Sequence, residues 1–254
     1  MTLRLSALPL ALLGFLNAAA AQESRQIAGG DASPARWSGV FAGLHAGYGR
    51  SSTNWGFPFF EYYNTAPGES FSIDPKGAFA GGHLLLNRQF GRVVLGAEGA
   101  FSKGSFREDR IGPVTVNFPE DRFSVNIDNI ATISGRLGYA FDKWLVYAKG
   151  GYATAEVSHH ALSGPPGEGV EAATEARQNG RIIGGGAEYM IAPMMVLGLE
   201  YSFVKLEAAR HSTTTTGVTV GLPANIDSDD IALHSVTARL SIKLGERPEA
   251  GNLK

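Results

Sequence analysis

His234 and Ser235 are the residue types of a hydrolytic centre, in which a histidine takes the proton of a serine hydroxyl. Adjacent positions do not suit that chemistry, because neighbouring residues of a strand point to opposite faces. Asp227, Asp229 and Asp230 precede them, and we interpret this run as the solvated end of an acidic loop. We therefore expect no enzymatic activity and no catalytic residue.

Metal and cofactor chemistry is not indicated either. The chain has no cysteine, which removes thiolate metal sites and thiol nucleophiles. His159 and His160 are adjacent, we expect them and His211 in solvated loops, and no third ligand is spaced to join them. The sequence contains no phosphate-binding loop, haem signature or calcium loop, and we expect no cofactor.

Six charged residues at inward positions of otherwise apolar or small-residue segments are the remaining candidates for chemistry. They are Glu98, Arg136, Lys149, Glu188, Glu200 and Arg239. Three are acidic and three are basic. Each lies about five to seven residues from a predicted turn or strand end, so tilted strands would bring all six to one level. His45 and His83 point to the same side by the same count.

The elements that position these residues are predicted to be strands. Between Asn129 and Phe141, apolar residues such as Ile133 and Leu137 alternate with small or charged residues, which is the period of a strand. The pattern recurs in eight segments: Ser38–Gly49, Gly77–Gln89, Val93–Ser102, Asn129–Phe141, Trp144–Val157, Gly180–Ile191, Met195–Leu206 and Ile231–Leu244. Each has about 10 to 14 residues, longer than a usual soluble strand and sufficient to cross a bilayer at a tilt.

The connections between these segments are alternately short and long. Turns near Phe90-Gly91, at Asp142-Lys143 and at residues 192–194 are short, whereas the other four connections each exceed about 20 residues. Short turns at one rim and long loops at the other are typical of an outer-membrane barrel. We predict an all-β fold, namely an eight-stranded antiparallel transmembrane β-barrel with short periplasmic turns and four long extracellular loops.

A soluble, lipocalin-like barrel is the alternative fold, since it also alternates apolar and polar faces. Two observations favour the membrane barrel. Aromatic residues gather at strand ends, as interfacial girdles require, and the polar faces carry Gly, Ala and Ser instead of many Lys, Glu and Thr. Crowding in a narrow lumen would explain the 33 glycines.

The N-terminus has the features of an export signal. Arg4 precedes an apolar run from Leu5 to Leu16, which is too short to span a bilayer as a helix, and Ala19-Ala20-Ala21 is a cleavage pattern. We expect a signal peptide at 1–21, a lead-in at 22–36, the barrel at 37–244 and a tail at 245–254. The formal charge of −2 argues against a nucleic-acid partner.

Two regions are open to more than one interpretation. Oppositely charged pairs in a narrow bore favour a neutral network that closes the lumen, and the alternative is a gate or a small ion path. The first long loop holds Trp55, Phe57, Phe59, Phe60, Tyr62 and Tyr63. These aromatic residues either form a binding surface or pack over the barrel mouth and contact lipid headgroups.

The sequence resembles the small OmpA-like eight-stranded outer-membrane proteins of alphaproteobacteria, a porin-family or immunogenic surface-protein group. The resemblance is carried by five segments that cover every predicted strand: WSGVFAGLHAGYG (Trp37–Gly49), GAFAGGHLLLNRQFGRVVLGAEGAF (Gly77–Phe101), GRLGYAFDKWLVYAKGGYA (Gly135–Ala153), GGGAEYMIAPMMVLGLEYSFV (Gly184–Val204) and HSVTARLSIKL (His234–Leu244). It implies an abundant envelope component and surface antigen in the outer membrane of a Gram-negative cell.

We therefore expect a structural, surface-presenting envelope protein with a lumen closed by ion pairs. A narrow porin-like channel is the second hypothesis, and a loop-mediated adhesin or receptor for a host or phage ligand is the third. The expected partners are outer-membrane lipid, lipopolysaccharide and the barrel-assembly machinery.

Overall fold

The structure is a computed structural model of the chain and describes residues 37–56, 70–111, 122–163, 170–214, 216–217, 223–228 and 230–245. The predicted signal peptide and lead-in, and all of the predicted tail except Gly245, lie outside the described residues. Within those ranges no helix is long and apolar enough to cross a membrane.

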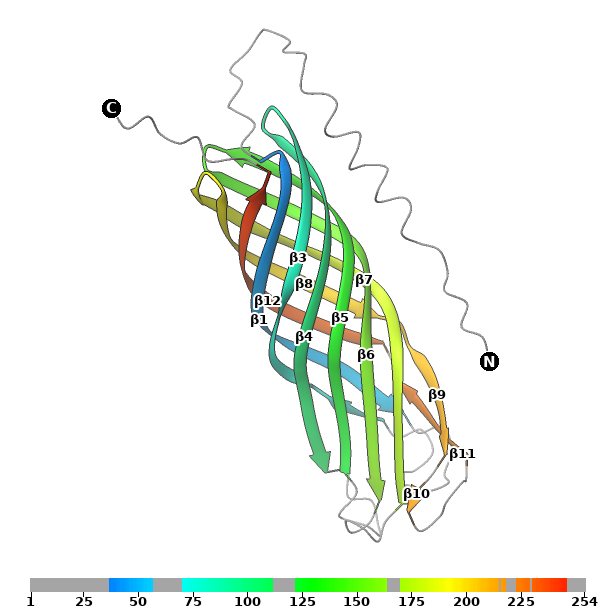
Figure 1. Ribbon diagram of the computed structural model, residues 1–254. Helices are drawn as coiled ribbons and strands as arrows, with labels where there is room; N and C mark the ends of the chain where they lie inside the picture. The colour runs from blue at the N-terminus through cyan, green and yellow to red at the C-terminus, as the bar shows by residue number, and fades with distance from the viewer. Residues whose placement is uncertain are drawn as a thin grey trace, which may run out of the picture. The chain divides into compact units, whose positions relative to one another are not determined.

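Eight long antiparallel strands form a closed barrel (Figure 1). They are β1 (Gly39–Gly56), β3 (Lys76–Phe90), β4 (Val93–Ile111), β5 (Arg122–Phe141), β6 (Trp144–Ser163), β7 (Val170–Ala192), β8 (Met195–Leu206) and β12 (Ile231–Leu244). Each strand pairs with its neighbours in the order β1, β3, β4, β5, β6, β7, β8, β12. The ring closes where β12 pairs with β1, with Val40 opposite Leu244 and Ser52 opposite Ala232. The predicted eight-stranded antiparallel barrel is confirmed.

Three short turns lie at one end of the barrel, as predicted. They join β3 to β4, β5 to β6 and β7 to β8. Two of these turns contain a residue with positive φ, Gly91 at 60° and Asp142 at 52°. Glycine adopts this left-handed conformation without steric cost, and aspartate is among the few other residues that tolerate it.

Short strands extend the sheet at the other end (Figure 1). They are β2 (Ser70–Ile73), β9 (Ala209–Thr214), β10 (Thr216–Gly217) and β11 (Pro223–Ser228). β2 and β11 pair with the end of β1, β9 pairs with β11, and β10 pairs with β7. The segments between the long strands therefore include paired ribbons that the sequence analysis placed in loops.

The barrel strands are longer at this end than predicted. β4 continues to Ile111 beyond the predicted end at Ser102, and β7 begins at Val170 and not at Gly180. By contrast, the predicted bounds of β8 and β12 match the observed ones. The prediction was wrong about strand length because it followed a polarity pattern that does not continue to the strand ends.

That pattern inverts along several of the long strands, and β6 shows it most plainly. Its outward residues are apolar or glycine from Trp144 to Tyr152, and the next outward residues are Thr154 and Glu156. Its inward residues change in the opposite sense, from the charged Lys149 to the apolar Val157. Apolar residues thus face outward in one zone, which we call the apolar belt, and inward beyond it.

The lumen is narrow enough to require glycine at some inward positions. A Cβ atom on Gly43 would lie 2.3 Å from the Leu240 carbonyl oxygen and 2.5 Å from the His83 ring. No side chain fits there, because both distances are far inside van der Waals contact. Crowding of this kind accounts for inward glycines in strands that otherwise favour larger residues.

Candidate functional site: a charged layer in the lumen

The structure brings the six charged residues together inside the barrel. Each comes from a different strand: Glu98 from β4, Arg136 from β5, Lys149 from β6, Glu188 from β7, Glu200 from β8 and Arg239 from β12. All six are buried, with at most 7% of any residue exposed. We call this set the charged layer.

Four members of the charged layer form one cluster of ion pairs. Arg239 donates to both oxygens of Glu98, at 3.1 and 2.6 Å, and its Nη1 lies 2.6 Å from Glu200 Oε2. Lys149 Nζ lies 2.8 Å from an oxygen of Glu98 and 2.8 Å from an oxygen of Glu200. Each carboxylate therefore contacts both cations, and the cluster is neutral.

Arg136 and Glu188 form a separate, bidentate pair. The two terminal guanidinium nitrogens of Arg136 lie 3.0 and 2.7 Å from the two oxygens of Glu188. Arg136 is directly opposite Lys149 in the sheet register, yet the two cations turn to different carboxylates. This arrangement avoids an unscreened contact between like charges in the low-dielectric interior.

Tyr147 links the two groups of ion pairs. Its hydroxyl donates a 2.6 Å hydrogen bond to Glu200, and the Arg136 guanidinium carbon lies 3.9 Å from the centroid of its ring. The sequence analysis missed this residue. The available signal was its position two residues before Lys149, which places both side chains on the inward face of β6.

His45 and His83 extend the polar groups of the lumen. Their Nδ1 atoms are 3.2 Å apart, and their Nε2 atoms lie 2.8 Å from the hydroxyls of Ser102 and Ser241 respectively. Both histidines point inward, as the alternation predicts. Among the described residues, no three His, Asp or Glu side chains are grouped so as to hold a metal ion.

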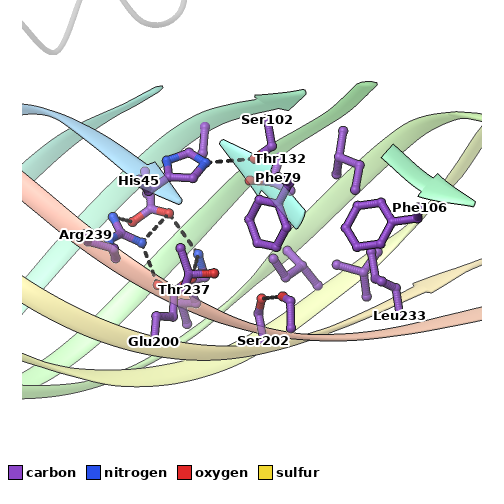
Figure 2. A pocket seen from close by; sticks show the side chains of 17 residues that line it. His45, Phe79, Ser102, Phe106, Thr132, Glu200, Ser202, Leu233, Thr237 and Arg239 are labelled. Carbon is purple, nitrogen blue, oxygen red and sulfur yellow. Dashed lines mark hydrogen bonds and ion pairs between the residues drawn. The ribbon is translucent and has the colours of Figure 1, made fainter. Parts of the chain in front are cut away.

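An apolar cluster fills the lumen on the loop side of the charged layer. This loop-side cluster consists of Phe106, Val125, Ile127, Ile130, Ala153, Ala155, Val157, Ile182, Val204, Leu206, Ile231 and Leu233. A cavity of about 50 Å³ lies where the cluster meets the charged layer. Figure 2 shows Arg239 and Glu200 at one end of this cavity and Phe106 and Leu233 at the other. The cavity has room for a few water molecules.

A second apolar cluster fills the lumen near the short turns. This turn-side cluster consists of Trp37, Phe41, Leu85, Val94, Ala140, Leu145, Met190 and Val196. Along β6 the order is therefore Leu145, then Tyr147 and Lys149, then Ala153 and Val157. Among the described residues, apolar clusters therefore flank the charged layer on both sides, and Lys243 is a further buried charge near the turn end of β12.

The other chemistry-bearing residues that the structure describes do not come together in one site. Ser235 points inward to Ser202, at 2.9 Å, whereas His234 lies on the outer surface and contacts the Tyr201 hydroxyl at 2.7 Å. The two side chains are on opposite faces, as the alternation predicts. Asp230 forms an ion pair with Lys205 at 2.7 Å.

Three histidines expected in loops belong to strands. His159 and His160 lie in β6, and His211 lies in β9. These positions correct the loop assignment. For His159 and His160 the reason is again the length of the strand beyond the apolar belt, whereas His211 lies in a separate short strand that pairs with β11.

The aromatic segment of the first long loop is described only in part. Trp55 belongs to β1, opposite Phe71 of β2, which corrects its assignment to a loop. Phe57, Phe59, Phe60, Tyr62 and Tyr63 lie outside the described residues. The binding-surface interpretation of this segment remains a prediction.

Comparison with known proteins gives a family match and two sequence relatives. A family model described as "Outer membrane protein beta-barrel domain" matches residues 6–225. The 31 kDa outer-membrane immunogenic protein of Brucella melitensis biotype 1 is 29% identical over 176 residues, covering 67% of this chain and 71% of that protein. The protein of the same name from Brucella suis biovar 1 has the same identity and coverage.

Solved structures give more distant similarities. The outer membrane protease OmpT from Escherichia coli has a TM-score of 0.48 at 11% identity, over 87% of this chain and 100% of that one. The outer membrane protein OprG from Pseudomonas aeruginosa has a TM-score of 0.47 at 10% identity, over 81% and 96% of the two chains. We draw nothing further from these two similarities, because both scores are low.

Proposed function

Since this chain belongs to the family of outer membrane protein beta-barrel domains, we propose that it is a barrel whose lumen is closed to ions. We propose that its role in the envelope is structural and surface-presenting. It is an outer-membrane protein of a Gram-negative cell, and its relatives include immunogenic surface proteins. Our proposal concerns its specific role within that class.

The observation that carries the proposal is the charged layer flanked by two apolar clusters. The charged layer is neutral and its carboxylates and terminal nitrogens are paired with one another. An ion crossing the lumen would have to pass both apolar clusters, and the buried Lys243 near the turn end of β12 is a further charge outside the charged layer. Apolar constrictions close pores by excluding water and therefore ions.

Single-channel recording tests the closed lumen. The refolded full-length protein is inserted into a planar bilayer, and the amount inserted is checked by the heat-modifiable band of the folded barrel on an SDS gel. We expect a flat current trace at every holding potential. Discrete conductance steps that scale with the amount of protein would instead support the narrow channel.

The surface-presenting role rests on the zone where the strands continue beyond the apolar belt. In this zone the outward residues are polar, and barrels of this class direct their longer loops to the cell exterior. The relatives from Brucella bear the name immunogenic, which fits exposure of this zone at the cell surface. Catalysis has no part in the proposal.

Cysteine labelling on intact cells tests this exposure. The chain contains no cysteine, so a single introduced thiol reports one site. We expect Glu175→Cys, in the exposed end of β7, to react with a membrane-impermeant maleimide on whole cells. The matched variant Arg92→Cys, in a short turn, should react only after the outer membrane is permeabilised. Labelling of Arg92→Cys alone on whole cells would contradict the orientation.

A further inference from the structure

Basic side chains gather on the outer surface of three adjacent strands just beyond the apolar belt. Arg50 of β1 is directly opposite Lys76 of β3, and Lys76 is directly opposite Arg107 of β4. Lys103 lies on the same face of β4. All four side chains are exposed and each alternates with residues that face inward. We call Arg50, Lys76, Lys103 and Arg107 the basic row.

The basic row lies where lipid headgroups meet the barrel. Tyr48 and Phe101 precede Arg50 and Lys103 by two residues on the same outward faces, and both aromatic residues are about half exposed. Aromatic residues in this setting mark the edge of the hydrocarbon region. The next outward residues along these strands therefore stand at the depth of the headgroups.

The positive charge of the basic row is only partly balanced by the described residues. Arg50 forms a 2.6 Å ion pair with Asp74, and the backbone N–H of Asp74 donates to Glu108. Lys76 and Lys103 make no ion pair with any residue that the structure describes. Like charges directly opposite each other destabilise a sheet. Lys76 stands between two arginines without a carboxylate of its own among the described residues, and a bound anion would relieve the repulsion there.

We propose that the basic row binds the phosphate groups of an outer-leaflet lipid, of which phosphorylated lipid A is the chemical type. Directly opposed residues are about 5 Å apart, so three cationic side chains lie within about 10 Å along the row. Arginine and lysine are the side chains that best bind phosphate. The row faces sideways into the membrane edge, where phosphate is held by lipids. This inference requires only the membrane placement of the barrel and goes beyond the proposed function.

The opposite wall of the barrel provides an internal control. β8 lies four strands from β4 in both directions around the ring. On that side Lys205 pairs with Asp230 at 2.7 Å, and Arg177 of the adjacent strand β7 pairs with Glu156 at 2.7 Å. These two cations are exposed and beyond the belt like the basic row, but each already contacts a carboxylate.

Lipid binding to the full-length protein in detergent micelles tests the proposal. Native mass spectrometry would count bound diphosphorylated lipid A for the wild type, for Lys76→Gln/Lys103→Gln, and for the control Arg177→Gln/Lys205→Gln. We expect affinity to fall about fivefold per lysine and about 25-fold for the first pair. The control should stay within about twofold, and added salt should weaken wild-type binding.

Two further arms identify the source of the phosphate. Lipid A without its phosphates should bind the wild type and the Lys76→Gln/Lys103→Gln variant equally weakly. Inorganic phosphate should compete poorly, because it lacks the acyl chains that lie against the belt. Equal losses in the two double variants, no loss in either, or competition by inorganic phosphate as strong as by lipid A would overturn the proposal. If the double variant fails to fold, Lys76→Gln alone is expected to show the fivefold loss.

Discussion

The charged layer illustrates how a membrane barrel keeps six ionised residues away from water. Removing a charge from water is costly, so a buried charge persists only when oppositely charged partners and hydrogen bonds compensate it. Here Glu98 contacts two cations, and Arg239 contacts two carboxylates. The consequence is strong interdependence, since no member can be removed without leaving the buried charges of its group unbalanced.

Arg136 gives the sharpest test of that interdependence. Arg136→Ala leaves the Glu188 carboxylate buried without the cation that both of its oxygens contact. We expect the free energy of unfolding to fall by about 3–5 kcal/mol. Urea unfolding in lipid vesicles, followed by tryptophan fluorescence, measures the change.

Two controls separate an unpaired charge from a simple loss of contacts. Arg177→Ala removes an exposed ion pair with Glu156 and should leave the free energy of unfolding nearly unchanged, because water screens such a pair. The double variant Arg136→Met/Glu188→Leu removes both charges and should recover most of the lost stability. Equal losses for Arg136→Ala and Arg177→Ala would show that the buried pair has no special importance.

Sequence reasoning located the charged residues but not their partners. Alternation alone decides which side of a strand a residue occupies, so all six charges, His45 and His83 could be placed inward from the sequence. Which carboxylate meets which cation depends on the stagger between strands, and the sequence does not state the stagger. Tyr147 was missed for a related reason, because a tyrosine in such a strand fits an interfacial girdle as well as a lumen.

At the scale of single elements, the strands follow two opposite rules. Within the apolar belt the outward residues are apolar, and the inward residues include the charged layer and the turn-side cluster. Beyond the belt the outward residues are polar and the inward residues form the loop-side cluster. Ile127 and Ile130 both belong to that cluster although they are three positions apart, because a β-bulge shifts the register between them. The inversion and the bulge together hid the strand extensions from a search for one uninterrupted pattern.

Glu156 tests whether the strands remain paired beyond the belt. Its carboxylate accepts a 2.6 Å hydrogen bond from Asn129 of β5 and a 2.7 Å contact from Arg177 of β7. The hydrogen bond from Asn129, with the bond from Arg177, holds the pKa of Glu156 below its ordinary value of 4.5. Because the folded pKa is lowered, these contacts contribute stability above the ordinary value and lose it as the pH falls through the folded pKa.

Carbon-13 NMR of the Glu156 carboxyl group in micelles checks this expectation. The wild type should titrate below the ordinary value, and Asn129→Ala and Arg177→Gln should each move the midpoint upward. An ordinary midpoint in the wild type that neither substitution changes would mean that β5, β6 and β7 separate at the edge of the belt.

At the scale of the whole molecule, the closing of the ring accounts for a lumen filled with side chains. Closing eight strands leaves an interior just wide enough for side chains to fill, so the lumen becomes a core. The sequence predicted the closed ring, because strand number, turn lengths and alternation all point to one topology. It did not predict the two apolar clusters. Their inward residues lie where the alternation of apolar outward residues with small or charged inward residues is interrupted or reversed.

The division of the lumen into layers predicts how the barrel responds when its charges are disturbed. If the ion pairs alone closed a pore, Glu98→Gln would open it, because the substitution weakens contacts with both Arg239 and Lys149. We expect instead that Glu98→Gln is less stable than the wild type and yet gives the same flat trace in a planar bilayer. Phe106 on one side and Leu145 on the other remain fully buried in apolar clusters that the substitution does not touch. A conducting Glu98→Gln barrel, at equal amounts of folded protein, would mean that the charged layer is a gate and that the apolar clusters are permeable to water.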